Sequence, residues 1–133
     1  MRNTIKSVLD SLIHLGFEVK RRKGTGYSAK SDSFGMYCYL KKADDSYLIC
    51  RFMLPNVVRV PKRGYVQYLE MVNEINEMIM DAKVIIYNKS ICSIHEFCII
   101  GDECMEDRIE NALSALRSSA LLIKMKTDAL YIP

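Results

Sequence analysis

The sequence has no long apolar run, no internal repeat and no low-complexity linker. A bilayer span needs about 20 consecutive apolar residues, and no segment approaches that length. Residues 1–6 begin an amphipathic segment without a small-residue cleavage site, so we expect no signal peptide, no membrane partner and a cytoplasmic protein. Half of the 133 residues are hydrophobic and 26% are charged, which excludes membrane, fibrous and disordered chains. We expect one domain over residues 1–133, with a core at about 3–125.

The motifs of common catalytic and metal sites are also missing. Five cysteines without an export signal are typical of free thiols in a reducing compartment. Cys92, His95, Cys98 and Cys104 are spaced like zinc ligands, but residues 91–100 form an expected strand, which places His95 on the face opposite Cys92 and Cys98. Neither a nucleophile elbow nor a phosphate-binding loop is present. We therefore predict no catalytic residue, no metal, no cofactor, no small-molecule substrate and no enzymatic activity.

Hydrophobic periodicity predicts three helices and five strands. The helices are expected over residues 3–15, 64–80 and 103–125, with Asn3 or Thr4 and Asp102 at positions where helix caps occur. The strands are expected over residues 17–21, 36–40, 47–54, 82–87 and 91–100, with 22–33 as a polar loop. The resulting order, α-β-β-β-α-β-β-α with short turns, predicts an α+β fold with a five-stranded antiparallel sheet packed by the helices.

Three segments between residues 54 and 96 resemble a known family. They are Leu54-Pro55-Asn56 after a strand, the helix containing Met71-Val72-Asn73-Glu74-Ile75-Asn76, and the hairpin that runs from Ala82-Lys83-Val84 to His95-Glu96. This pattern and the element order resemble the YbjN-like family, a group of proposed bacterial sensory transduction regulators, and the type III secretion chaperones. The resemblance implies a secretion-chaperone-like fold, regulatory or chaperone-like work, a protein client or a second copy as homodimer, and no catalytic residues.

The predicted strands are apolar on both faces, whereas a sheet covered on one side should alternate apolar with polar residues. Three helices with one apolar stripe each can cover only one face, so a second apolar face needs another partner. We hypothesise that this face is a protein-binding or dimer surface that includes Tyr37, Tyr39, Tyr47, Ile49 and Met53. The alternative is that these side chains are part of the intramolecular core.

Positive charge is concentrated in the first half of the chain. Residues 1–63 hold 13 Lys and Arg against 5 Asp and Glu, and the remainder holds 6 against 11. One interpretation is that the two halves attract each other; another is a basic binding face. The run Lys20-Arg21-Arg22-Lys23, interleaved with tyrosines, keeps nucleic-acid binding as an alternative function, although a pI of 8.6 and the lack of a ribonucleoprotein signature do not favour it.

Overall fold

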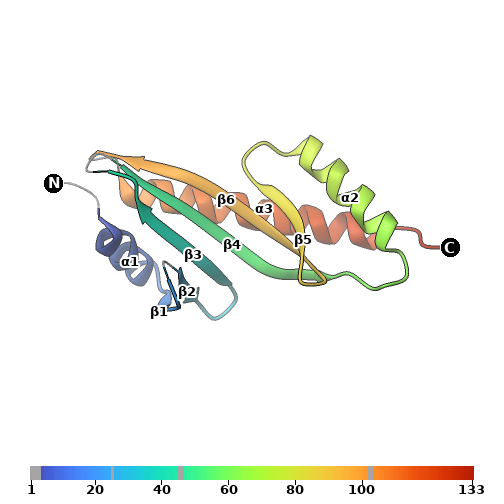
Figure 1. Ribbon diagram of the computed structural model, residues 1–133, viewed down its shortest axis with the longest axis horizontal. Coiled ribbons are helices and arrows are strands. Elements are labelled where there is room, and N and C mark those ends of the chain that lie inside the picture. Colours follow the sequence, from blue (N-terminus) through green and yellow to red (C-terminus); the bar gives the residue numbers. More distant parts are fainter. Residues whose placement is uncertain (1–3, 25, 45–46, 102–103) are drawn as a thin grey trace.

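The computed structural model describes residues 4–24, 26–44, 47–101 and 104–133, which form three helices and six strands (Figure 1). The sheet is antiparallel throughout, with the strand order β1-β2-β3-β4-β6-β5. In chain order the elements are α1 (Ile5–His14), β1 (Glu18–Arg21), β2 (Gly26–Lys30), β3 (Gly35–Lys42), β4 (Tyr47–Arg59), α2 (Tyr65–Met78), β5 (Lys83–Tyr87), β6 (Ser90–Ile100) and α3 (Met105–Asp128).

The expected α+β class is correct, but the expected five strands are wrong. The additional strand is β2, which lies in the segment predicted to be a polar loop, so the order is α-β-β-β-β-α-β-β-α. It pairs with β1 on one side and with β3 on the other. Its pattern of buried and exposed residues alternates only weakly. Tyr27 and Ala29 are its two apolar side chains that pack into the larger core cluster. Two neighbouring strands stabilise this segment more than its own composition does.

Strand β4 also differs from expectation, because it continues past Pro55 to Arg59. The pairing with β6 shifts between Leu54 and Val58, so three β4 residues bulge opposite one residue of β6. Asn56 has a φ of 53°, a left-handed conformation that asparagine tolerates better than most residues. A proline fits in such a bulge because no ladder hydrogen bond is required of it.

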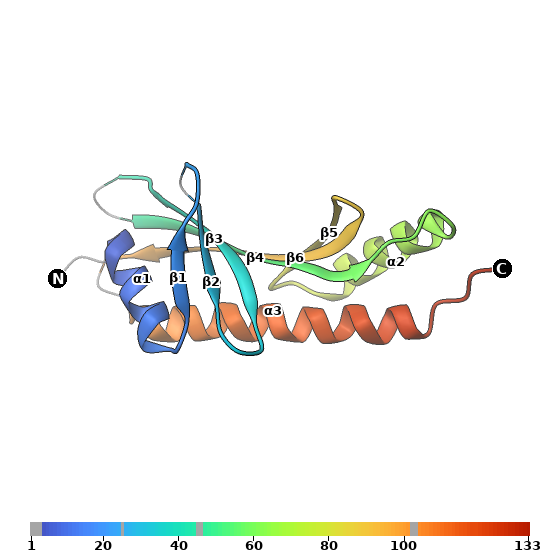
Figure 2. The same cartoon turned by 90° about the horizontal axis from the view of Figure 1, so that it is seen from below.

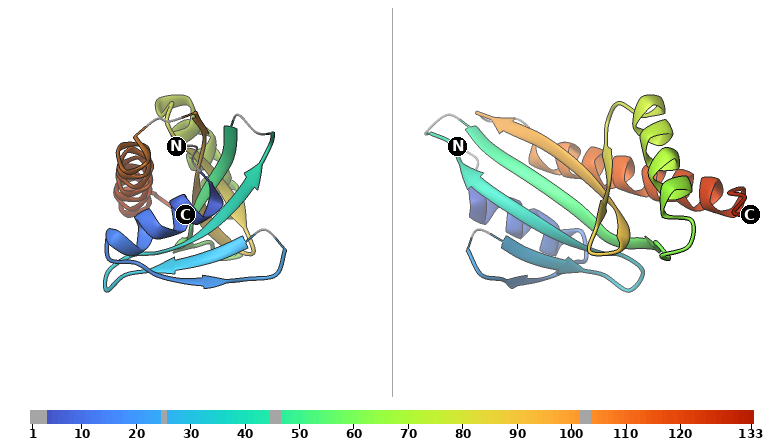
Figure 3. Two further views of the ribbon diagram at one scale, coloured as in Figure 1. Left: turned by 90° about the vertical axis from the view of Figure 1, so that its left-hand side faces the viewer. Right: turned by 45° about the vertical axis from the view of Figure 1, so that its right-hand side comes forward.

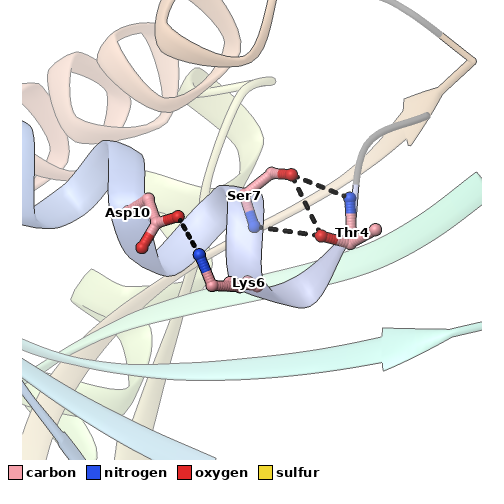
Figure 4. A network of polar contacts seen from close by, with 4 residues as sticks. All are labelled: Thr4, Lys6, Ser7 and Asp10. Atoms are coloured by element: carbon pink, nitrogen blue, oxygen red, sulfur yellow. Dashed lines mark hydrogen bonds and ion pairs between the residues drawn. The ribbon is translucent and has the colours of Figure 1, made fainter. Parts of the chain in front are cut away.

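The first helix begins where the sequence suggests. Thr4 and Ser7 form a capping box, in which the Thr4 hydroxyl accepts from the Ser7 N–H at 3.1 Å and the Ser7 hydroxyl accepts from the Thr4 N–H (Figure 4). One turn further, Lys6 pairs with Asp10 at 2.9 Å. The expected caps Asn3 and Asp102 lie outside the described residues.

The helices are not distributed evenly around the sheet. Helices α1 and α3 lie on one face, and α2 packs beside the edge strand β5 and against the C-terminal half of α3 (Figures 2 and 3). Two apolar clusters result. The larger joins α1 and the first half of α3 to strands β2, β3, β4 and β6, and the smaller joins α2, β5 and the end of α3. Among the described residues, no helix is long and apolar enough to cross a membrane.

Side-chain hydrogen bonds attach the helices to the sheet. The Asn76 side chain accepts from the Val84 N–H at 2.7 Å and donates to the Val84 carbonyl at 2.8 Å, which ties α2 to the outer edge of β5. The buried hydroxyls of Ser93 and Ser119 bond to each other between β6 and α3. Near the C-terminus, Ile132 packs against Gly64. A side chain at position 64 would place its Cβ in contact with the Cδ1 of Ile132.

Candidate functional site

The face of the sheet opposite α1 and α3 has no helix over it in the described part of the chain, and we call it the open face (Figure 3). Strand register shows which residues share it. Tyr37 lies directly across from Met53, Tyr39 across from Arg51, and Lys41 across from Ile49. Directly opposed residues on adjacent strands point to the same face. The full set on β3, β4 and β6 is Tyr37, Tyr39, Lys41, Tyr47, Ile49, Arg51, Met53, Ile94, Glu96, Cys98 and Ile100.

All five residues predicted to form an apolar surface therefore lie on this one face. Tyr39 is 41% exposed, and Tyr37, Tyr47, Ile49 and Met53 are half-buried. Their neighbours on the same strands point the other way and are fully buried in the larger cluster: Met36, Cys38, Leu40, Leu48, Cys50 and Phe52. The sheet thus has one face covered by helices and one, with apolar and charged residues, that water reaches.

Strand β6 extends the apolar surface beyond the predicted residues. Ile94 lies across from Met53, Cys98 across from Ile49, and Ile100, which is 59% exposed, across from Tyr47. The sequence shows that this strand is apolar on both sides. It does not show which side the helices cover, so the β6 residues could not be assigned to the surface in advance.

An ion pair crosses the middle of the open face. The Arg51 guanidinium donates to Glu96 Oε1 from Nε at 2.8 Å and from Nη2 at 2.6 Å, between opposed positions of β4 and β6. Both side chains are about half exposed, so the pair adds little to stability. Its effect is to leave the β4–β6 part of the face without net charge.

A hollow of about 610 Å³ lies where the open face meets the loop before β5. Arg51, Ile94 and Glu96 form one side of it, and Met80 and Ile85 form the other. Met80 is fully exposed to solvent. An exposed methionine beside an apolar strand surface is typical of contacts that adapt to the partner's shape.

The predicted basic run separates on folding. Lys20 lies across from Ser28, which lies across from Tyr37, so Lys20 belongs to the open face. Arg21 lies across from Tyr27 and points to the other face. Arg22 and Lys23 follow β1, and both line hollows next to the open-face tyrosines.

The cysteines and histidines do not assemble into a reactive centre in the described chain. His95 lies across from Phe52 and bonds through Nδ1 to the Asp81 carbonyl, whereas Cys98 is on the opposite face. The described residues contain no group of three or more His, Cys, Asp or Glu that could hold a metal ion. Burial raises the pKa of both the Cys38 and the Cys50 thiol to about 12, and such thiols are weak nucleophiles at neutral pH.

A six-stranded antiparallel sheet with helices on one face and a solvent-reached apolar face on the other defines an α+β protein whose candidate site is a surface. No family model matches the chain, and no curated protein does. The crystal structure of YbjN, a proposed transcription regulator from E. coli, superposes with a TM-score of 0.61 over 98% of this chain and 97% of that chain, at 11% identity. The chain therefore has a YbjN-like fold from end to end, and at this identity the likeness concerns the fold alone.

Proposed function

We propose that this protein is a non-enzymatic, protein-binding module, chaperone-like or regulatory, that acts through the β4–β6 part of its open face. The partner is a client protein segment or a second copy that forms a homodimer. The observation that supports this proposal best is the row of half-exposed apolar residues on a sheet face over which the described residues place no helix. Contiguous apolar patches of this kind on soluble proteins usually mark interaction sites.

The chemistry of the surface also favours a protein over a small molecule. Ile49, Met53 and Ile94 form an apolar strip along two long strands, and the Arg51–Glu96 pair offers hydrogen bonds without net charge. Apolar centres with few unpaired charges are typical of protein interfaces. The adjoining hollow beside Met80 would take a side chain of the partner.

The test is the variant Ile49→Asp, which places a charge at an apolar position of the strip, two residues from Arg51. Lys41, directly across on β3, can pair with the new carboxylate, so we expect the protein to remain folded. The matched control is Val66→Asp, which changes a 60% exposed residue on α2, away from the open face. Solution mass by light scattering and recovery of a bound protein from cell extract are the readouts.

We expect the unchanged protein and Val66→Asp to form the same complex, with themselves or with one recovered protein, and Ile49→Asp to lose it. If the unchanged protein is a monomer that recovers no partner, and Ile49→Asp alters neither its stability nor its mass, the proposed function is wrong.

A second candidate function is contact with nucleic acid through the basic residues of the first half. The observation in its favour is that Arg22 and Lys23 line the same hollow as Tyr37 and Tyr39. Salt discriminates between the two functions, because phosphate contacts lose affinity steeply as the salt concentration rises and apolar contacts do not.

A further inference from the structure

Two adjoining hollows occupy the β1–β3 end of the open face. One, of about 290 Å³, lies over β1, β2 and β3, and the other, of about 400 Å³, lies beside the turn that joins β1 to β2. Arg22 and Tyr37 line both, so the hollows form one continuous surface. It adjoins the β4–β6 strip along β3, since Tyr37 and Tyr39 lie directly across from Met53 and Arg51. Its cations lie on β1, on β2 and just after β1, so they can be changed without altering β4 or β6.

The charge of this surface suits a polyanion. Its lining residues include four cations, Lys20, Arg22, Lys23 and Lys30, and a single acid, Glu18. Glu18 pairs with Lys20 at 3.7 Å, and three of the four positive charges are left in excess. The β4–β6 strip, by contrast, carries an internal ion pair and no net charge.

Planar groups lie among these cations. Tyr37 and Tyr39 are two positions apart on β3 and therefore share the open face. The Arg22 guanidinium lies over the Tyr37 ring, 5.8 Å from its centre, so a base can stack on the guanidinium above the ring or displace it and stack on the ring. The Tyr39 ring lies over Gly26, where an added Cβ would come within 3.4 Å of its Cε1.

We propose that this surface binds single-stranded nucleic acid, with bases stacked on Tyr37, Tyr39 and the Arg22 guanidinium and phosphates held by Lys20, Lys23 and Lys30. The inference rests on the second candidate function and names its substrate class. Alternating aromatic and cationic groups on a sheet bind unpaired bases, whose ring faces are free. A duplex hides those faces inside its stack and would use only the cations.

The experiment measures binding of fluorescein-labelled 12-mers, oligo(dT) and oligo(U), by fluorescence anisotropy at two salt concentrations. A duplex of the same length tests whether phosphate contacts alone explain the binding. Poly-glutamate, added as a competitor, tests whether any polyanion binds equally well. The stacking variant is Tyr37→Ala with Tyr39→Ala, and Tyr37→Phe with Tyr39→Phe restores the rings. Tyr131→Ala is the matched control, because Tyr131 is 80% exposed and lies outside the hollows.

We expect both single strands to bind at least tenfold more tightly than the duplex. The alanine pair should weaken single-strand binding about tenfold or more, since stacking contributes roughly 1–3 kcal/mol per base. The phenylalanine pair and Tyr131→Ala should leave it within about twofold. Lys20→Ala with Lys23→Ala should reduce the slope of log affinity against log salt by about 1.4, because each phosphate contact on a single strand contributes about 0.7.

The failures are distinguishable. If the duplex binds as tightly and the alanine pair has no effect, the contact is with phosphates alone; nucleic-acid binding then survives and the single-strand proposal is wrong. If poly-glutamate competes as well as oligo(U), the surface takes an acidic protein and the proposal is also wrong. Absence of binding to every oligonucleotide at low salt overturns the proposal and the second candidate function together.

Discussion

The bond pair between Asn76 and Val84 gives the sharpest prediction for the fold. Val84 is 1% exposed and lies on the edge strand β5, so its N–H and carbonyl on the outer side have no further strand to bond. The Asn76 side chain supplies both partners, as a neighbouring strand would. Asn76→Ala removes both partners together. The Val84 N–H and carbonyl then have only water to bond, and water must enter a closely packed sheet edge to reach them.

The magnitude follows from the two bonds and their burial. A net hydrogen bond contributes about 1 kcal/mol, and a buried group left unpaired costs about 1–3 kcal/mol. Alanine recovers roughly 0.5 kcal/mol because it favours the helix more than asparagine does. Two bonds of about 1 kcal/mol each, less that gain, predict that Asn76→Ala lowers the free energy of unfolding by at least about 1.5 kcal/mol, and by more where a freed Val84 group stays unpaired.

Urea unfolding followed by circular dichroism measures this change. Asn73→Ala is the matched control, since Asn73 is exposed on the same helix and should leave stability unchanged or slightly higher. Asn76→Asp should also lower stability, because a carboxylate still accepts from the Val84 N–H but sets its second oxygen against the Val84 carbonyl oxygen. A loss below about 0.5 kcal/mol for Asn76→Ala would refute the assignment of α2 to the sheet edge.

Three further predictions concern the cysteines and the contact between β6 and α3. In the folded protein Cys98 and Cys104 should react with Ellman's reagent within minutes and the other three thiols only after unfolding, as absorbance at 412 nm reports. Because the folded pKa of Cys38 and of Cys50 is raised from 9.0 to about 12, the stability they support is complete below pH 9 and should decline as the pH rises from 9 toward 12. Urea titrations across that range, with both thiols changed to alanine as control, should show a flatter decline in the variant. Ser119→Ala should cost about 1–3 kcal/mol, since it removes the partner of a buried hydroxyl on β6; an unchanged urea midpoint would contradict this.

Much of the fold follows from local pattern. The stripe of α1, the capping box at Thr4 and the alternation on β4 each specify their element because burial and backbone hydrogen bonding agree there. The exceptions have a common cause, which is stabilisation by neighbours. Strand β2 has a weak intrinsic strand propensity and is stabilised by pairing with β1 and β3. Strand β4 continues beyond Pro55 because, in the bulge, the proline does not need to donate a hydrogen bond to β6.

The candidate site was only partly predictable for the same reason. Residue alternation indicates that Tyr37, Ile49 and Met53 share a face, since their spacing along two paired strands fixes it. The proximity of Arg22 to Tyr37 could not be foreseen, because it requires β2 to bring the end of β1 back over β3. Because the sequence does not reveal β2 as a strand, its register with β1 and β3 could not be predicted either.

The proposed contact surface is the open face and not the helical side of the sheet. The most direct test places a benzophenone amino acid at position 49 on the open face and, separately, at position 66 on α2, then irradiates cells that contain each protein. We expect a discrete protein adduct from position 49, with a second copy or another protein, and none from position 66. No adduct from position 49, or the same adduct from both positions, would show that the open face is not the contact surface.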